Sequence, residues 1–327
     1  MMSVDTLILT ALRAAGETGV AGTELAARLG VSRAAVWARI RELRALGYEI
    51  EASPHRGYRL LGVPDLLHAD DLRSRLGPTR VLGRDIQVFE ETTSTNDVVE
   101  RLARDGVKEG VVVFAEAQTR GRGRLGRKWL SPARKGLWLS ALLRPPLTPT
   151  AATQVTVAAA VALFRAIRSQ TGLTPEIKWP NDLLLGGRKT AGILTEMAAE
   201  PDKVKHVVVG VGVDVNLTAS EFPEELRPIA TSLRIATGQR QSRAELAVRL
   251  LQELDRVYEL ICTGRFEIVA DEWEEHCTTI GRRVTIHQGG RPLQGTAESL
   301  DPDGALLLRT DYGRLERIIG GDVTLDK

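Results

Sequence analysis

The sequence is poor in the residues that cross-link chains or bind metals. Among its 327 residues there are two cysteines, Cys262 and Cys277, and five histidines. The cysteines match no metal-ligand spacing and the histidines are scattered, which argues against a zinc site. With so little cysteine, a reducing cytoplasm is the expected location of the protein.

Long apolar runs are also missing. No run reaches the roughly 18–20 residues of a membrane span, and no charged segment followed by an apolar one opens the chain as a leader would. The net charge of +2 excludes little, so a surface for nucleic acid must come from local clustering of basic residues. A hydrophobic content of 43% and a charged content of 26% are ordinary for a soluble protein of two or three compact units, without a membrane partner.

Residues 1–62 have the pattern of three short helices followed by a β-hairpin. An apolar stripe predicts the first helix, and it consists of Leu7, Ile8, Leu12 and Ala15. The second helix is expected to have Thr23 as its N-cap and to end at Gly30, and the third to begin after the N-cap Ser32. Strands are expected at 48–51 and 58–61. This order predicts a winged helix-turn-helix domain, whose third helix enters the major groove of DNA.

Basic side chains gather on the expected DNA-binding face. The third helix turns Val36, Ile40 and Leu43 inward, which leaves its arginines, Arg33, Arg39, Arg41 and Arg44, on the outside. Three short helices alone also occur in ordinary bundles, but an arginine-rich face and a basic wing favour DNA binding. The candidate DNA contacts are Ser32, Arg33, Arg39 and, at the tip of the wing, Arg56.

Beyond a linker at 62–64 the chain changes character. From residue 69, strands and helices alternate without a βαβ rhythm, which predicts a central mixed-sheet α/β domain over 69–276. Residues 279–327 contain short strands broken by glycines, which predicts a small closing β-barrel. The fold class is therefore α+β multidomain. Strands are expected at 111–116, 137–143, 182–196 and 206–215, and helices at 153–170 and at 242–262, the latter opened by a capping box of Ser242 and Glu245.

A glycine- and arginine-rich loop runs from Gln118 to Trp129. Three glycines let the backbone approach a ligand, and five cationic side chains fall within nine residues, as an anion site requires. The glycines also spell the dinucleotide-binding fingerprint, but the Ser131-Pro132 pair blocks the helix that this fingerprint needs. A P-loop does not fit either, because Gly126 is followed by an arginine. By composition alone, the loop is either a phosphate-binding loop or a solvated basic loop.

Three further segments add polar and cationic groups. Residues 178–182, Lys-Trp-Pro-Asn-Asp, place a lysine beside a rigid turn, and Gly186-Gly187 can then turn a hairpin into 189–196. A buried strand at 207–216 carries two glycines on one face, Gly210 and Gly212, which leaves room for a ligand. Ser94, Thr95 and Asn96 open a helix, where they either cap it or hydrogen-bond a small polar ligand.

In this order, the segments at 94–96, 118–129, 178–182 and 189–196 resemble those of the biotin–protein ligase family, and the resemblance covers essentially the whole chain. It implies a winged helix-turn-helix head, a ligase domain and an SH3-like β-barrel. It also implies a two-step reaction: biotin and ATP, with Mg²⁺, form biotinyl-5′-adenylate, and a lysine of a biotin carboxyl carrier protein then displaces AMP. The adenylate would regulate binding of the head to operator DNA and promote a homodimer.

The resemblance also implies roles for individual residues. Cations must neutralise both the attacking carboxylate and the α-phosphate, so catalysis would depend on Lys178, Arg122 and Arg124. Biotin would be bound by Ser94, Thr95, Asn96, Gln118, Arg122, Gly123, Arg124 and Lys178. The nucleotide would be bound by Arg124, Arg127, Trp129, Lys178, Asn181 and Asn216, and Asp182 is the candidate ligand of Mg²⁺.

Alternatives to this assignment share parts of the pattern. A ligand-sensing regulator without ligase activity would need fewer cations, and a lipoate-type ligase uses the same chemistry; the intact cations favour a ligase and the complete loop favours biotin. Residues 217–234 should cover the adenine, but they contain Phe222 and no tryptophan. Strand 138–142 is expected to lie at the surface and to pair across the axis of the dimer, where the carrier protein would compete.

Overall fold

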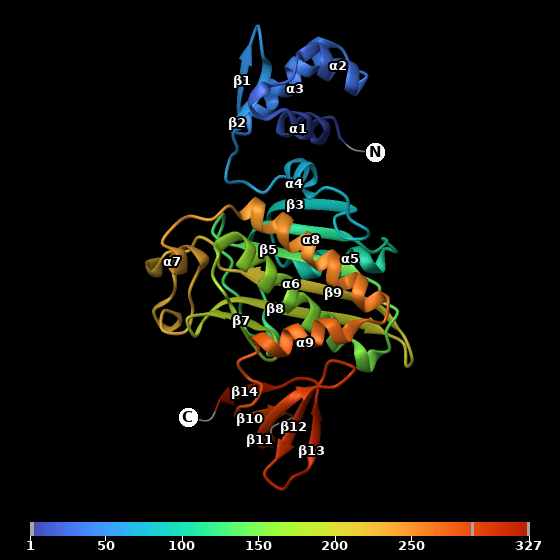
Figure 1. Ribbon diagram of the computed structural model, residues 1–327, viewed down its shortest axis with the longest axis vertical. Coiled ribbons are helices and arrows are strands. Elements are labelled where there is room, and N and C mark those ends of the chain that lie inside the picture. The colour runs from blue at the N-terminus through green and yellow to red at the C-terminus, as the bar shows by residue number, and fades with distance from the viewer. Residues whose placement is uncertain (1–2, 289–290, 326–327) are drawn as a thin grey trace. The chain divides into compact units, whose positions relative to one another are not determined.

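The computed structural model describes residues 3–288 and 291–325, which divide into two compact units, Met1–Pro78 and Thr79–Lys327. The first unit is a winged helix-turn-helix with one additional helix (Figure 1). Its core is formed by the apolar faces of the three head helices and of the wing, including Ile8, Leu25 and Ile40. In chain order its elements are α1 (Val4–Ala15), η1 (Gly16–Thr18), α2 (Gly22–Leu29), α3 (Arg33–Ala45), β1 (Glu49–Ser53), β2 (Gly57–Gly62) and α4 (Ala69–Leu76).

The helix boundaries of the head agree with the sequence at most positions. Ser32 is the N-cap of α3 and accepts a hydrogen bond from the amide of Ala35, and Gly30 ends α2 in the left-handed conformation. The expected cap at Thr23 is wrong: the N-cap is Ala21, two residues earlier and without a side-chain cap, and Thr23 lies inside the helix. Leu7 is 37% exposed and so does not belong to the buried stripe of α1.

Helix α4 belongs to the first unit, although the composition groups it with the domain that follows. Its carboxylates bind back to α1: Asp71 forms an ion pair with Arg13, and Asp70 accepts hydrogen bonds from Ser3 and Thr6. The boundary between the compact units therefore lies at residue 78, beyond the linker at 62–64.

The second unit is built on a seven-stranded mixed sheet in the order β3-β4-β5-β9-β8-β7-β6. Strands β3 and β4 are parallel, and the other neighbours are antiparallel. Helices α6, α8 and α9 lie together along the sheet in Figure 1. The strands are β3 (Asp85–Thr92), β4 (Val111–Gln118), β5 (Leu137–Leu143), β6 (Glu176–Lys178), β7 (Asp182–Leu185), β8 (Arg188–Ala199) and β9 (Val204–Val213). The helices are α5 (Thr95–Arg104), η2 (Arg124–Gly126), η3 (Pro149–Ala151), α6 (Thr153–Thr171), η4 (Ala219–Glu221), η5 (Glu224–Leu226), α7 (Leu233–Thr237), α8 (Arg243–Cys262) and α9 (Phe266–His276).

The alternation of side chains along the strands decides which groups share a face of the sheet. Ser140 on β5 pairs with Gly210 on β9, and Gly210 pairs with Leu194 on β8, so these three lie on one face. Helix α5 packs on the same face, because Val99 clusters with Leu142, two residues from Ser140. Thr195 points to the other face, where its hydroxyl bonds that of Thr156 on α6. The face shared with α5 is the face that carries the candidate site.

Helix α6 is a core helix. Within the described chain, one helical stretch, Pro149–Thr171, is long and apolar enough to cross a membrane by length and composition, and 72% of its apolar window is buried inside the protein. Polar and charged residues interrupt this stretch, so the sequence contains no continuous apolar run of that length. Helix α8 begins after Ser242, which accepts from the amide of Glu245 as expected, but the Glu245 carboxylate pairs with Arg249 and does not complete a capping box.

Strand β5 contradicts the expectation that 138–142 pairs across a dimer axis. It lies inside the sheet between β4 and β9, and all seven of its residues are buried. Both of its hydrogen-bonding edges are used within the chain, so it has none to offer to a second copy.

The C-terminal strands form a five-stranded antiparallel sheet, where the sequence predicts a small barrel. The order is β13-β12-β11-β10-β14, and Val284, Ile286 and Leu308 are buried on it. Its strands are β10 (Arg283–Gln288), β11 (Arg291–Leu300), β12 (Leu306–Thr310), β13 (Leu315–Ile318) and β14 (Asp322–Leu325).

Candidate active site

A cavity of about 630 Å³ opens on the face of the large sheet that carries α5. Every residue that the sequence assigns to biotin lines it: Ser94, Thr95, Asn96, Gln118, Arg122, Gly123, Arg124 and Lys178. The nucleotide candidates Arg127, Trp129 and Asn181 line it as well, as does Asp182. Segments far apart in the sequence therefore meet in one cavity.

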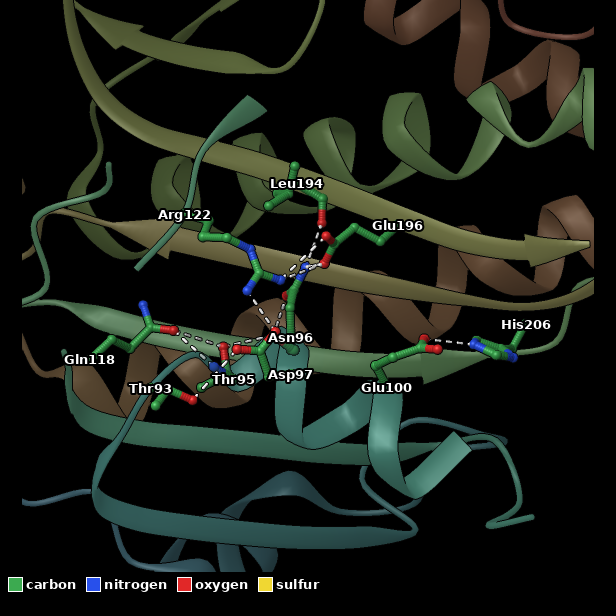
Figure 2. Close-up of polar contacts among 11 residues, drawn as sticks. Thr93, Thr95, Asn96, Asp97, Glu100, Gln118, Arg122, Leu194, Glu196 and His206 are labelled. Carbon is green, nitrogen blue, oxygen red and sulfur yellow. Dashed lines mark hydrogen bonds and ion pairs between the residues drawn. The ribbon is translucent and has the colours of Figure 1, made fainter. Parts of the chain in front are cut away.

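Uncharged polar groups line the cavity where α5 begins, and we call this part of it the polar end. Figure 2 shows the side chains of Thr95, Asn96 and Gln118 close to one another there. The Gln118 side-chain oxygen accepts from the amide of Thr95 at 2.9 Å, and the Gln118 amide donates to Ser131. The Ser140 hydroxyl lies 2.7 Å from the Thr95 hydroxyl and 2.6 Å from Asn96 Oδ1. Ser94 is the N-cap residue of α5, yet its side chain makes no cap hydrogen bond. Ser94 also lines the cavity.

Two glycines of β9 are required by what packs on them. A Cβ atom on Gly210 would lie 2.2 Å from Asn96 Oδ1, and a Cβ atom on Gly212 would lie 2.6 Å from Trp129 Nε1. The indole of Trp129 in turn packs edge-on against Trp138, with 6.5 Å between the ring centroids. These glycines make room for the side chains of Asn96 and Trp129, and they also line the cavity, as the sequence predicts.

The glycine- and arginine-rich loop places its cations at the cavity from one side. Its ends are held by hydrogen bonds from the Trp129 amide to the Gly121 carbonyl and from the Gly123 amide to the Arg127 carbonyl. Arg122 forms ion pairs with Asp97 and Glu196, and Arg124 lies 3.4 Å from the side-chain oxygen of Asn181.

Lys178 enters the cavity from β6. The antiparallel register of β6 and β7 places it opposite Asp182, and the cis peptide bond between Trp179 and Pro180 turns the chain between them. Among the described residues, no carboxylate lies within ion-pair distance of the Lys178 ammonium. A cation without a protein counter-ion, in a cavity lined by other cations, is suited to an anionic ligand.

Lys189 and Asp214 are site residues that the sequence did not single out. The Lys189 ammonium lies 2.6 Å from Asp182 and 5.2 Å from the ring centroid of Trp129, and it lines the cavity. Asp214 also lines the cavity and is 6% exposed. Burial raises the pKa of its carboxyl well above the ordinary 3.8, although the charge of Lys189 lowers it in part.

The segment expected to cover the adenine does line the cavity. Phe222 is 3% exposed there, and the apolar neighbours on the same segment are Leu226, Pro228 and Ile229. Asn216 lies elsewhere: it is buried outside the cavity lining, and its side-chain amide exchanges two hydrogen bonds with the backbone of Gln241. In this structure Asn216 fixes a loop.

The described residues contain no group of three histidine, cysteine, aspartate or glutamate side chains that could hold a metal ion. Asp182 offers a single carboxylate to the cavity, and that carboxylate is paired with Lys189. This donor set does not form a protein-only Mg²⁺ site, but it fits a Mg²⁺ ion whose other ligands are water and substrate phosphates.

The candidate DNA-binding face belongs to the first unit. Arg33 and Arg56 are exposed, whereas Arg39 donates to both carboxylate oxygens of Asp5 and also pairs with Glu42. Arg39 therefore ties α3 to α1. Trp37 is 53% exposed on α3.

Buried polar side chains are the functional residues that sequence patterns miss most easily. Ser140 interrupts an otherwise apolar strand, which is a detectable signal, and it bonds two of the candidate ligand-binding residues. Asp214 directly follows the apolar strand β9, whereas Glu196 lies within β8 and is half-buried. Neither residue has a local signal in the sequence that shows what it faces.

The fold and the cavity define a class: an α+β domain that binds an anionic small molecule, joined to a winged helix-turn-helix unit and a C-terminal antiparallel sheet. Residues 88–214 match the biotin/lipoate A/B protein ligase family, 6–59 match an HTH domain and 279–326 match the biotin protein ligase C-terminal domain. The chain is 38% identical over 311 residues to the bifunctional ligase/repressor BirA of Bacillus subtilis, covering 95% of each chain. To the protein of the same name from Escherichia coli it is 32% identical over 320 residues, which are 98% of this chain and 96% of that one.

A solved structure agrees with these matches. The biotin protein ligase from Aquifex aeolicus, in complex with biotin and ATP, superposes with a TM-score of 0.63 at 28% identity, covering 75% of this chain and 99% of that one. This chain belongs to the biotin–protein ligase family, in its bifunctional ligase/repressor form.

Proposed function

We propose that this protein joins biotin to ATP to form biotinyl-5′-AMP and then transfers biotin to a lysine of a biotin carboxyl carrier protein. The observation that carries this proposal is the composition of one cavity. Its polar, uncharged end holds Ser94 and Thr95, its cationic side holds Arg124 and Lys178, and the apolar segment at Phe222 borders it. These surfaces match, in turn, a ureido ring, a carboxylate with phosphates, and a purine base.

In the first step, an oxygen of the biotin carboxylate attacks the α-phosphorus, and the bond to the β-phosphate breaks to release pyrophosphate. Both partners are anionic, so their approach requires positive charge that is already in place. Lys178 is a compact point charge between the positions of carboxylate and α-phosphate, while Arg122 and Arg124 can hold oxygens by paired N–H donors. Arg127, Lys128 and Lys189 add positive charge to the same cavity.

A divalent cation would assist this step. Mg²⁺ usually keeps several waters and binds through one or two carboxylates plus substrate phosphates. Asp182 would be the protein ligand, and Lys189 would then have to share or release its carboxylate.

In the second step, the neutral ε-amine of the acceptor lysine attacks the acyl carbon of the adenylate. The bond from that carbon to the phosphate oxygen breaks, AMP leaves, and the amine loses a proton to solvent. The same cations stabilise the departing phosphate. No serine or cysteine nucleophile of the enzyme is needed, since the intermediate is held without a covalent bond.

We propose as a second function that the head binds operator DNA and represses transcription of biotin-synthesis genes, with biotinyl-5′-AMP as corepressor. The supporting observation is the exposed position of Arg33 on the recognition helix and of Arg56 on the wing. Ser32, as the cap of α3, fixes the start of that helix. Arg39 contributes by holding α3 against α1.

Regulation would pass through a ligand-promoted homodimer. One winged head makes few contacts, whereas two heads on one dimer turn the second contact into an intramolecular event. Because β5 is internal, an edge of the sheet would have to provide the interface; β3 and β6 are its terminal strands. The carrier protein would compete for the dimer. We place these events in the cytoplasm, where free thiols such as those of Cys262 and Cys277 persist.

The test is a comparison of ligands on the intact protein. Calorimetric titration with biotin, with lipoate, and with biotin plus ATP, together with pyrophosphate release, separates the candidate activities. We expect binding of biotin, little binding of lipoate, and pyrophosphate release that requires both biotin and ATP. Biotin binding without pyrophosphate release would instead identify a ligand-sensing regulator.

A further inference from the structure

Arg122 is held from two sides by acidic residues that do not line the cavity. Its Nη1 lies 2.6 Å from Asp97 Oδ1, and its Nη2 lies 3.3 Å from each carboxylate oxygen of Glu196 (Figure 2). Asp97 lies in the first turn of α5, and Glu196 lies on the cavity face of β8. We name these two carboxylates the anchoring pair.

Glu196 also bonds the polar end of the cavity. Its Oε2 accepts from Asn96 Nδ2 at 2.6 Å, while Asn96 Oδ1 accepts from Ser140 at 2.6 Å. A continuous series of hydrogen bonds therefore runs from Thr95 and Ser140, through Asn96 and Glu196, to Arg122. The glycine- and arginine-rich loop is connected by side chains to the groups that face the ligand.

Arg122 can be anchored and still bind a ligand. A guanidinium group has five N–H donors, and the anchoring pair uses only part of them. The same side chain lines the cavity. Partial burial lowers the pKa of Arg122, but the hydrogen bond to Asp97 and the charge of Glu196 outweigh that effect and raise the pKa above its ordinary value, so the group stays charged.

We propose that Asp97 and Glu196 are positioning residues that hold the loop of residues 121–129 closed over the adenylate, by fixing Arg122 to α5 and β8. The inference rests on the proposed ligase function, in which the adenylate must stay bound until the acceptor lysine arrives. Because Glu196 also bonds Asn96, occupation of the polar end of the cavity stabilises the closed loop.

The exposure of the three side chains sets the strength of this anchor. The side chains of Arg122, Asp97 and Glu196 are 37%, 39% and 43% exposed. Ion pairs this accessible to water are weak and are screened by salt. An anchor of this strength keeps the loop closed most of the time, yet lets it open for substrate entry and for the acceptor lysine.

The experiment removes charge while keeping shape, with Glu196→Gln, Asp97→Asn and the double variant in the full-length protein. Glu298→Gln is the matched control, because it removes an ion pair of similar exposure, with Arg309, on the C-terminal sheet. The first readout is hydrogen exchange of the Gly123 and Trp129 amides in the ligand-free protein, since both are hydrogen-bonded within the loop. The second is the rate at which preformed biotinyl-5′-AMP leaves the protein.

We expect the double variant to exchange these amides, and to release the adenylate, about fivefold to tenfold faster than the wild type. Between about 50 mM and about 500 mM salt, release should quicken more in the wild type than in the double variant, which has no anchoring ion pairs left to screen. Unchanged exchange and release in the double variant, as in Glu298→Gln, would overturn the proposal. Slower release would also overturn it, because Arg122 would then be held away from the ligand. Failure of the wild type to make an adenylate would refute the ligase function alone, since hydrogen exchange still tests the anchor.

Discussion

Gly212 on β9 gives the indole of Trp129 its place beside the sheet, since a Cβ atom on Gly212 would lie 2.6 Å from Nε1. Gly192 on β8 packs on the same indole less tightly, at 3.1 Å from Cζ3. If Trp129 borders the nucleotide, Gly212→Ala should displace it and raise the KM for ATP by about tenfold or more. Gly192→Ala should raise it by only a few-fold, since a contact above 3.0 Å needs a small shift. Equal KM values in steady-state pyrophosphate release would exclude Trp129 from the nucleotide site.

Lys178 is expected to act on the transition state more than on the ground state. Lys178→Ala should lower the rate of adenylation by a factor of about 10² or more, as loss of comparable oxyanion donors does. Biotin binding, measured by calorimetry without ATP, should weaken much less. Lys178→Arg is the matched control: it keeps the charge but not its compact shape, so it should recover activity only in part. Full turnover in Lys178→Ala would remove the lysine from the mechanism.

Asp214 should make stability depend on pH. Its pKa is raised by burial, so above the ordinary value of 3.8 the folded state holds a proton that the unfolded state has lost. Stability therefore falls as pH rises from about 4 towards the folded-state pKa, by about 1.4 kcal/mol for each unit of the shift. Asp214→Asn should raise the melting temperature at pH 7 and flatten the dependence above pH 4. If the melting temperature of the variant changes with pH as much as that of the wild type across this range, the assignment is contradicted.

The exposed arginines of the head and Arg39, which is bonded to Asp5, should respond differently to substitution. Arg33→Ala and Arg56→Ala should weaken binding and each reduce the slope of log K against log salt by about 1, because each loses a phosphate contact. Arg39→Ala should instead lower the melting temperature of the head, since it breaks the bonds to Asp5. Removal of residues 1–78, the whole first compact unit, should leave adenylation intact. A DNA-binding constant that does not change with salt concentration would refute the phosphate contacts.

Ligand and dimer must be linked in both directions. If biotinyl-5′-AMP promotes assembly, the dimer must bind the adenylate more tightly by the same factor. Sedimentation with and without saturating adenylate should show a shift from monomer to dimer, and dilution of the loaded protein should speed adenylate release. If saturating ligand does not change the monomer–dimer equilibrium, ligand-promoted dimerisation is not the mechanism of repression.

Several features of this protein can be predicted from residues that are close together in the sequence. The cap at Ser32, the wing, the glycine turn at 186–187 and the order of the binding segments follow from residue types a few positions apart, and the structure brings those segments to one cavity. The wrong prediction of a cap at Thr23 also has a local cause, because helix boundaries shift easily by one or two residues.

What only the tertiary structure decided is which distant side chains meet. Periodicity gives the face on which a residue lies within its own strand, but not the neighbour across the sheet, which depends on strand order and register. For that reason the sequence could not show that β5 is internal, that Asn216 turns away from the cavity, or that Arg39 bonds Asp5. The same long-range register brings Glu196 and Asp97 to Arg122, and places the carboxyl of Asp214 at a cavity where burial raises its pKa well above the ordinary value.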